Sequence, residues 1–349
     1  MFDKRKVIWA LLALAIAVLT IRTVFVNCRD LSPAQVFAAL QQADPFWLAV
    51  TVLSMVGFIV FEALALLSVL RVLGYPRSFF AGVLYSAGDQ FFSAITPSAS
   101  GGQPASILFM RRHKIPGAAI TVVLVLNLVM YTAAALFIGV LCLIFRPQVF
   151  LRFDWFSRFL IVFGMVALTG LGLFFLALLK RGETLERLGR GLFRLLHRLH
   201  LMRSPERWNK RLADMVEEYR LCAEAASGKT SLLIRVFLLD LAQRAAQITV
   251  TLTLFLALGG SFGRQAADLW VVQALAQIGS NCVPIPGGMG AADYLMLDGF
   301  QSLFAPEFSY QLQILSRGFA FYVCTLLSGI IVLAGALVYR RSARKDKER

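Results

Sequence analysis

The chain has 349 residues, of which 58% are hydrophobic and only 16% are charged, and its formal net charge is +15. This composition excludes an ordinary soluble domain, which needs far more charged surface, and indicates a polytopic helical membrane protein. Most basic residues lie beside apolar runs, so we expect them to face anionic lipid headgroups rather than nucleic acid. Five scattered cysteines without a C-x-x-C pair indicate neither a metal site nor a disulfide framework.

The first apolar run, residues 7–26, follows Lys4, Arg5 and Lys6. No small-x-small cleavage site follows it, which favours a retained span over a cleaved signal peptide. A loop at 27–45 with little net charge leads to a second predicted span at 46–70, which carries Glu62 and ends near Arg71.

A polar break comes next, between two apolar pieces too short to be full spans, residues 79–95 and 103–110. Residues 90–102 read QFFSAITPSASGG, and basic residues RRHK close the second piece at 111–114. Irregular backbone at membrane depth is tolerated only inside protein or beside a water-filled cavity. Full spans are then expected at 117–145 and 157–179.

Residues 180–230 form the one sizeable polar segment. Leucines recur at three- and four-residue steps from Leu185 to Leu199 with arginines between them, which predicts a basic amphipathic helix. A second apolar stripe includes Trp208 and Tyr219. We expect this helix pair to lie on the membrane surface or over the bundle.

A fifth predicted span at 232–258 carries Asp240 and Arg244, which are four residues apart and can pair along a helix. A second break follows: residues 277–293 read QIGSNCVPIPGGMGAAD, between apolar pieces at 268–283 and 289–304. The last predicted span covers 310–339 and precedes the basic tail at 340–349.

The two breaks share the spacing Q-x-x-S-x-x-x-P followed by a glycine pair, with Gln90 and Gln277 about 187 positions apart. Residues 46–145 and 232–339 each read span, broken pair, span, but they are entered from opposite sides if basic loops stay in the cytoplasm. The fold class is therefore expected to be all-α, with about six full spans and two re-entrant broken pairs in an inverted repeat. Charge alone does not distinguish a re-entrant pair from two full spans.

In inverted-repeat transporters, broken helices from both halves meet near the midplane and form the substrate site. We therefore expect the two breaks to face each other across a polar cavity. The charged residues within spans are costly in hydrocarbon and need a partner or a role there. Mutual pairing that only holds the bundle together is the alternative to substrate contact. The candidate substrate-binding residues are Glu62, Asp89, Ser93, Pro97, Gly101, Gly102, Gln103, Asp240, Arg244, Ser280, Pro284, Pro286, Gly287, Gly288, Asp293 and Arg317.

We expect different roles for the charged candidates and for the two glycine pairs. Arg244 and Arg317 would contact a phosphate, and Asp89, Asp293 or Glu62 an amine. Each glycine pair serves either tight helix packing or a turn that exposes backbone amides to an anionic headgroup. The sequence contains no P-loop, G-x-S-x-G, Cys–His pair or H-E-x-x-H, so no catalytic residue, cofactor or metal is expected.

The stretches SAITPSASGGQPASILFMRRHKIP and PIPGGMGAAD resemble the lysylphosphatidylglycerol synthase transmembrane-domain family, the flippase half of the bacterial multiple peptide resistance factor. The resemblance implies a bacterial inner-membrane protein that moves a lipid headgroup, such as an aminoacylated phosphatidylglycerol or a glycolipid, between leaflets. The lysines and arginines near the span ends predict that both termini are cytoplasmic. In full-length members a soluble carboxy-terminal domain transfers lysine from lysyl-tRNA to phosphatidylglycerol. The chain ends ten residues after its last predicted span, so we expect that domain to be absent.

Three hypotheses follow. The first is a flippase for a phospholipid or lipid-linked headgroup, with membrane lipids as its partners. The second is phosphatidylglycerol lysyltransfer or another intramembrane lipid-modifying activity. The third is a non-transporting protein that positions a separate lipid synthase through residues 180–230.

Overall fold

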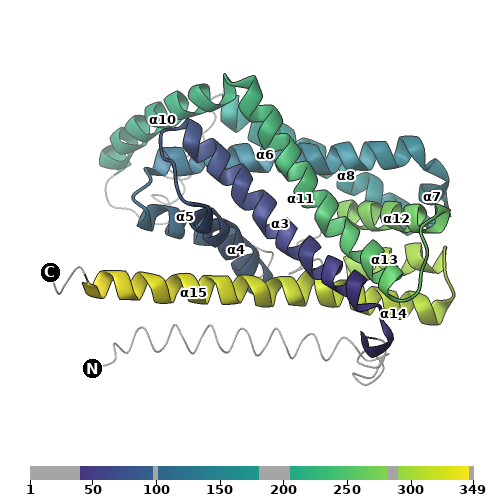
Figure 1. Cartoon of the computed structure of the whole chain (residues 1–349). Helices are drawn as coiled ribbons and strands as arrows, with labels where there is room; N and C mark the ends of the chain where they lie inside the picture. The colour runs from purple at the N-terminus through teal and green to yellow at the C-terminus, as the bar shows by residue number, and fades with distance from the viewer. Residues whose placement is uncertain (1–39, 97–100, 181–204, 282–289, 346–349) are drawn as a thin grey trace.

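The computed structural model describes residues 40–96, 101–180, 205–281 and 290–345, and every regular element in those ranges is a helix (Figure 1). The predicted all-α class is therefore confirmed. The predicted first span at 7–26 and residues 346–349 of the tail lie outside the described residues, as do residues 97–100 and 282–289 of the two breaks.

The same succession of helix lengths occurs twice. In the first half, helices of 28, 17 and 11 residues precede a long helix; these are α3 (Pro45–Val72), α4 (Phe79–Ile95), α5 (Gly102–Arg112) and α6 (Gly117–Phe145). In the second half, the same lengths belong to α11 (Thr230–Ala257), α12 (Arg264–Ser280) and α13 (Ala291–Gln301). Between the halves lie α7 (Pro147–Arg152), α8 (Trp155–Lys180) and α10 (Pro205–Ser227).

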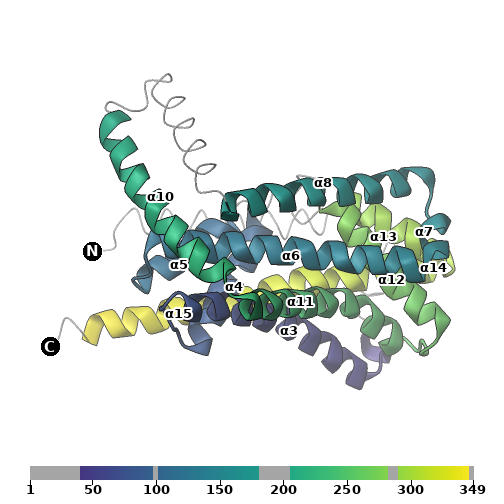
Figure 2. The ribbon, with the colours of Figure 1, turned by 90° about the horizontal axis from the view of Figure 1, so that it is seen from above.

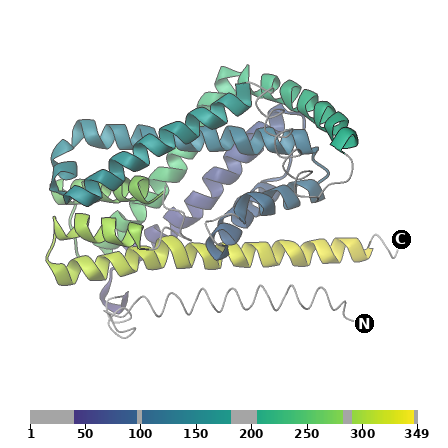
Figure 3. The same cartoon turned by 180° about the vertical axis from the view of Figure 1, so that it is seen from behind.

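The long helix of the second half is interrupted. The predicted span at 310–339 consists of α14 (Pro306–Arg317), a π-helical turn η3 (Gly318–Val323) and α15 (Cys324–Lys345). These three pieces follow one another without a break and run the length of the molecule (Figure 3). A π-helical turn inside an α-helix is rare and often marks a functional site.

Helices α3 and α11 pack against each other in opposite directions. The backbone N–H of Asp44 donates to the carbonyl of Ala257 at 2.8 Å, near the start of one helix and the end of the other. Farther along, Thr51 donates to Thr253 at 2.8 Å, and Gln243 donates to Glu62 at 3.2 Å. The first helices of the two halves are thus antiparallel, as an inverted repeat requires.

Each short helix pair forms a hairpin whose two ends meet. At one end of the molecule, Arg77, before α4, donates to the carbonyl of His113, after α5, at 2.8 Å. At the opposite end, Gln265, in the first turn of α12, donates to the carbonyl of Leu303, after α13, at 3.1 Å. Helices of 17 and 11 residues reach only about 26 and 16 Å, short of the ~30 Å hydrocarbon layer. These bonds and lengths fit the re-entrant reading of both pairs.

Four helices in the described residues are long and apolar enough to cross a membrane: 45–72, 117–145, 155–180 and 306–338. They confirm four of the predicted spans. The predicted span at 232–258 forms one continuous helix, α11, but is not among the four, because its polar stripe lowers its hydropathy. Viewed from above, α6, α8 and α11 extend along the same direction as α3 (Figure 2).

Some predicted boundaries were wrong. The second hairpin was placed at 268–283 and 289–304, but α12 begins at Arg264 and α13 ends at Gln301. The loop after residue 145 contains the short helix α7. Asp268 on α12 holds α7 in place, because it forms ion pairs with Arg146 at 3.0 Å and Arg152 at 3.4 Å, at either end of α7.

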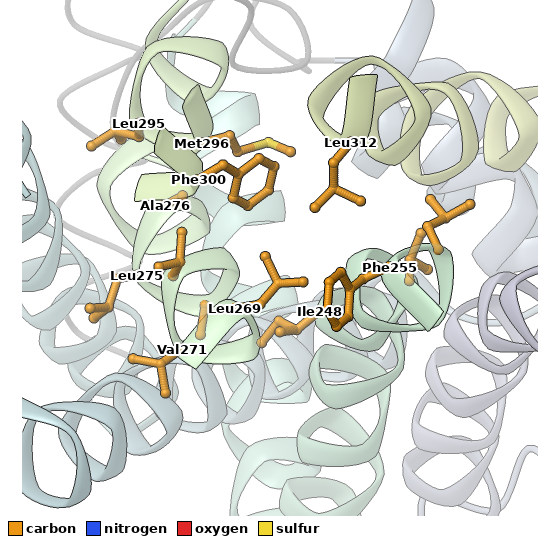
Figure 4. Packing of buried hydrophobic residues seen from close by; sticks show 14 of the residues in the cluster. Ile248, Phe255, Leu269, Val271, Leu275, Ala276, Leu295, Met296, Phe300 and Leu312 are labelled. Carbon is orange, nitrogen blue, oxygen red and sulfur yellow. The ribbon is translucent and has the colours of Figure 1, made fainter. Parts of the chain in front are cut away.

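The apolar core is divided into two clusters. One lies among α11, α12, α13 and α14, where Phe255, Leu269, Phe300 and Leu312 pack together (Figure 4). The other includes Leu66 on α3, Tyr85 on α4 and residues of α6 and α10. Glu62 and Arg244, near the middle of α3 and α11, lie between the parts of these helices that enter the two clusters. The buried polar residues therefore lie at mid-height.

Candidate functional site

A cavity of about 240 Å³ lies at this mid-height. Side chains from α3, α4, α6, α11, α12, α13, α14, η3 and α15 line it, so both halves contribute. Among the described residues, the charged side chains that line it are Arg244 and Arg317, and both are cationic.

The repeated sequence motif converges on this cavity. Gln90 and Ser93, near the end of α4, line it together with Gln277 and Ser280, near the end of α12. The ends of α4 and α12 therefore meet at one polar space. Pro97, Pro284, Pro286, Gly287 and Gly288 belong to the tips but lie outside the described residues.

Arg244 is buried at the cavity with hydrogen-bond donors that have no partner in the described residues, as expected of a ligand-binding residue. It is only 4% exposed, and its guanidinium lies 3.7 Å from the centre of the Tyr131 ring. Its Nη1 donates to Gln247 at 2.7 Å, whereas Nε and Nη2 have no hydrogen-bond partner in the described part of the chain. Buried charged groups without partners are strongly unfavourable, so these two donors are suited to an anion that enters the cavity.

Two further polar atoms of cavity-lining residues lack partners among the described residues. They are Oε1 of Gln273 and Oγ of Ser316. The site thus offers unpaired donors and an unpaired acceptor, which favours a ligand that carries both an anionic group and hydroxyl or amine groups.

Arg317 is positioned by the second hairpin. Its Nε lies 2.9 Å from Oδ1 of Asp293 in the first turn of α13, while Oδ2 of Asp293 accepts the backbone N–H of Gly290 at 3.0 Å. Gly290 has φ +84°, a left-handed conformation that glycine adopts without strain. The π-helical turn begins directly after Arg317 and contributes Ala320 and Phe321 to the cavity wall.

The remaining acidic candidates lie outside the cavity lining. Glu62 accepts hydrogen bonds from Ser86 at 2.8 Å and Gln90 at 2.9 Å, and the carboxyl group of Asp89 lies within its hydrogen-bonding reach. Gln90, which also lines the cavity, connects this group to it within the described residues.

Asp240 and Arg244, whose spacing permits a pair along α11, do not form a hydrogen-bonded ion pair in the described structure. Asp240 is fully buried, and neither of its carboxylate oxygens has a hydrogen-bond partner in the described residues. The spacing along α11 permits a pair, but the ring of Tyr131 and the amide of Gln247 hold the guanidinium at the cavity instead.

The first glycine pair serves close packing. A Cβ on Gly102 would lie 2.1 Å from Oδ1 of Asp89, and a Cβ on Gly101 would lie 2.6 Å from the Thr96 methyl group. The backbone N–H of Gly101 also donates to Oγ1 of Thr96 at 2.8 Å, which closes the hairpin. Gln103 is half-buried and is absent from the cavity lining that the structure describes.

Sequence reasoning did not identify Gln273 and Ser316 as site residues. Gln273 carries a signal, because it is a polar side chain between the buried apolar residues Val272 and Ala274. Ser316 is recognisable only as the neighbour of Arg317, since small hydroxyl residues are common in helices that pack in membranes.

The comparisons with known proteins agree with this architecture. The family model described as "Lysylphosphatidylglycerol synthase TM region" matches residues 8–328. None of the curated proteins compared with the chain matches it. The match covers both hairpins, all of the cavity-lining residues and the helices that join them, so the chain belongs to the lysylphosphatidylglycerol synthase transmembrane-region family.

Proposed function

We propose that the protein translocates a phospholipid or lipid-linked headgroup between leaflets, with the phosphate bound by Arg244 and Arg317. The single observation that carries this is the buried guanidinium of Arg244, which lines the cavity with two unpartnered donors. Arginine suits phosphate because its planar fork donates two parallel hydrogen bonds.

The position of the cavity supports the same function. It lies between the middles of α3 and α11, where a headgroup would be halfway across the bilayer. Large apolar side chains on the lipid-facing part of α15, including Leu326, Ile330 and Leu333, are exposed. Acyl chains would stay against such surfaces while the headgroup crosses through the cavity.

Orientation follows from the distribution of basic residues. The end of the molecule that holds the Arg77–His113 contact also holds Arg71, α10 and the end of α15 (Figure 1). By the positive-inside rule this end faces the cytoplasm, which places the carboxy terminus there. The proposed setting is the bacterial inner membrane, with anionic or aminoacylated phospholipid or a glycolipid as cargo and a separate lipid synthase as its supplier.

Translocation of a fluorescent phosphatidylglycerol by the purified protein in liposomes tests the proposal. Arg244→Ala should slow translocation at least about tenfold, because a hydrogen bond to a charged group contributes about 1.5–3 kcal/mol. Arg235→Ala, an exposed arginine on the same helix, is the matched control and should translocate at the wild-type rate. Liposomes with wild-type protein that move lipid no faster than empty liposomes would refute the proposal.

A further inference from the structure

Three carboxyl groups are buried together at mid-height, behind the cavity. Glu62 on α3 and Asp240 on α11 are 5% and 0% exposed, and Asp89 on α4 lies against Glu62. In the described residues, both oxygens of Asp240 and Oδ1 of Asp89 have no hydrogen-bond partner. Among the described residues, no group of three His, Cys, Asp or Glu residues has the arrangement of a metal site.

Buried carboxylates need a compensating charge, and a proton can supply it. Two carboxyl groups in contact cannot both be ionised at low cost, so Glu62 and Asp89 are suited to share a proton. An isolated carboxylate in an apolar setting is even less favourable, so a charge on Asp240 needs either a nearby cation or a proton. The nearest basic side chain on α11, Arg244, points to the cavity rather than to Asp240.

The carboxyl groups are connected to the cavity. The side-chain amide of Gln90 lines the cavity and donates to Glu62 at 2.9 Å, and Gln243, next to Arg244 in the chain, donates to Glu62 at 3.2 Å. A charge that enters beside Arg244 therefore acts on this group over a short distance. The ionisable side chains that interact with Glu62 from neighbouring helices are Arg244 on α11 and Cys324 on α15, in addition to Asp89 and Asp240 themselves.

We propose that Glu62, Asp89 and Asp240 form a proton-binding site whose occupancy is coupled to the headgroup in the cavity. This inference rests on the proposed function and adds its energy source. Arg244 offsets part of the negative charge of Glu62 when the cavity is empty, and an anionic phosphate in the cavity competes for this arginine. The phosphate then leaves the carboxylates uncompensated, so a carboxylate takes up a proton from water and releases it when the phosphate departs. Lipid movement and proton movement are linked in this way.

The first experiment measures proton uptake on binding. Calorimetric titration of short-chain phosphatidylglycerol into the detergent-solubilised protein, in buffers of different ionisation enthalpy, gives the number of protons bound per lipid. Wild-type protein should take up about one proton per lipid, and Asp240→Asn should take up fewer. Glu224→Gln, an exposed carboxylate on α10, should match the wild type. Lipid binding by the wild type with no proton uptake would overturn the inference.

The second experiment separates this inference from the proposed function. Translocation by wild type and Asp240→Asn is measured in liposomes with and without an imposed pH gradient. The wild type should respond to the gradient, and Asp240→Asn should lose the response. Translocation by the wild type at the same rate in both conditions would overturn proton coupling but leave translocation standing. Proton-linked binding without any translocation would refute the proposed function and leave the proton site in place.

Discussion

Arg317 on α14 donates from Nε to Oδ1 of Asp293 on α13 across 2.9 Å, at the edge of a cavity that Arg317 itself lines. The carboxylate thus compensates a cation that an anionic headgroup would also approach. Ion pairing and headgroup binding are therefore in competition at this arginine.

Asp293→Asn should tighten the binding of phosphatidylglycerol. The amide can still accept the N–H of Gly290, but it no longer offsets the charge of Arg317. We expect a gain of severalfold in affinity, since partly exposed ion pairs contribute up to about 1 kcal/mol. Calorimetry with short-chain phosphatidylglycerol at low and high salt measures it. Glu307→Gln, which removes an exposed charge from α14, serves as the control, and weaker binding by Asp293→Asn would contradict the prediction.

Cysteines at Ser93 and Ser280 should be joined by a short bismaleimide, because both positions line one cavity. The experiment requires a background in which all five native cysteines are alanine. Ser93 paired with Ser302 is the control, since α13 carries Ser302 to the far end of its hairpin, about 16 Å along the helix. Mass spectrometry of digested protein identifies the link. Equal linkage in both pairs would mean that the hairpin tips do not meet as described.

Gly102→Ala should destabilise the first hairpin. The added methyl group would lie 2.1 Å from Oδ1 of Asp89 and 2.6 Å from the backbone carbonyl oxygen of Asp89. The backbone of a helix cannot move aside without a loss of stability. Overpacking of this kind costs about 1–3 kcal/mol. Gly170→Ala on α8 meets nothing within 4 Å and should be neutral or slightly stabilising. Thermal unfolding in detergent compares the two, and equal midpoints would contradict close packing at Gly102.

The contact between α8 and the second hairpin should weaken in acid. Partial burial acts to raise the pKa of Asp154, but hydrogen bonds from the Tyr294 hydroxyl and Ser157 outweigh it and hold that pKa below its ordinary value of 3.8. A carboxylate with a lowered folded pKa stabilises the fold above its unfolded pKa, and this stabilisation is lost as pH falls through the folded pKa.

Stability measurements on Asp154→Asn from about pH 6 to about pH 3 test this. The wild type should be the more stable protein at the upper end, and the difference should shrink as the pH falls. Glu224→Gln, which removes an exposed carboxylate, should show no such convergence. A difference that stays constant with pH would show that Asp154 contributes through packing instead.

Much of the fold could be predicted because a backbone segment that crosses the hydrocarbon layer must satisfy its own hydrogen bonds, which a helix does. Long apolar runs must be helices, and basic residues mark their ends, so the start of α6 and the ends of α4 and α6 fell at the predicted residues. The repeated Q-x-x-S spacing indicated which segments would meet, and all four of its polar residues line one cavity.

Side-chain direction within the site could not be predicted. Asp240 and Arg244 have the spacing of a helical ion pair, but Arg244 contacts Gln247 on its own helix and Tyr131 on α6 instead. Gln273 was missed for a related reason, because an unsatisfied amide oxygen is visible only when all the surrounding helices are in place.

Helix α8 belongs to neither half, yet it decides how the halves combine. The first half begins and ends at the same end of the molecule, since α3 and α6 run its length in opposite directions around a hairpin (Figure 1). One more traverse, by α8, starts the second half from the opposite end. Without α8, the second half would start at the same end of the molecule as the first half. The two halves would then have the same orientation, and both hairpins would lie in one leaflet with no cavity shared between them.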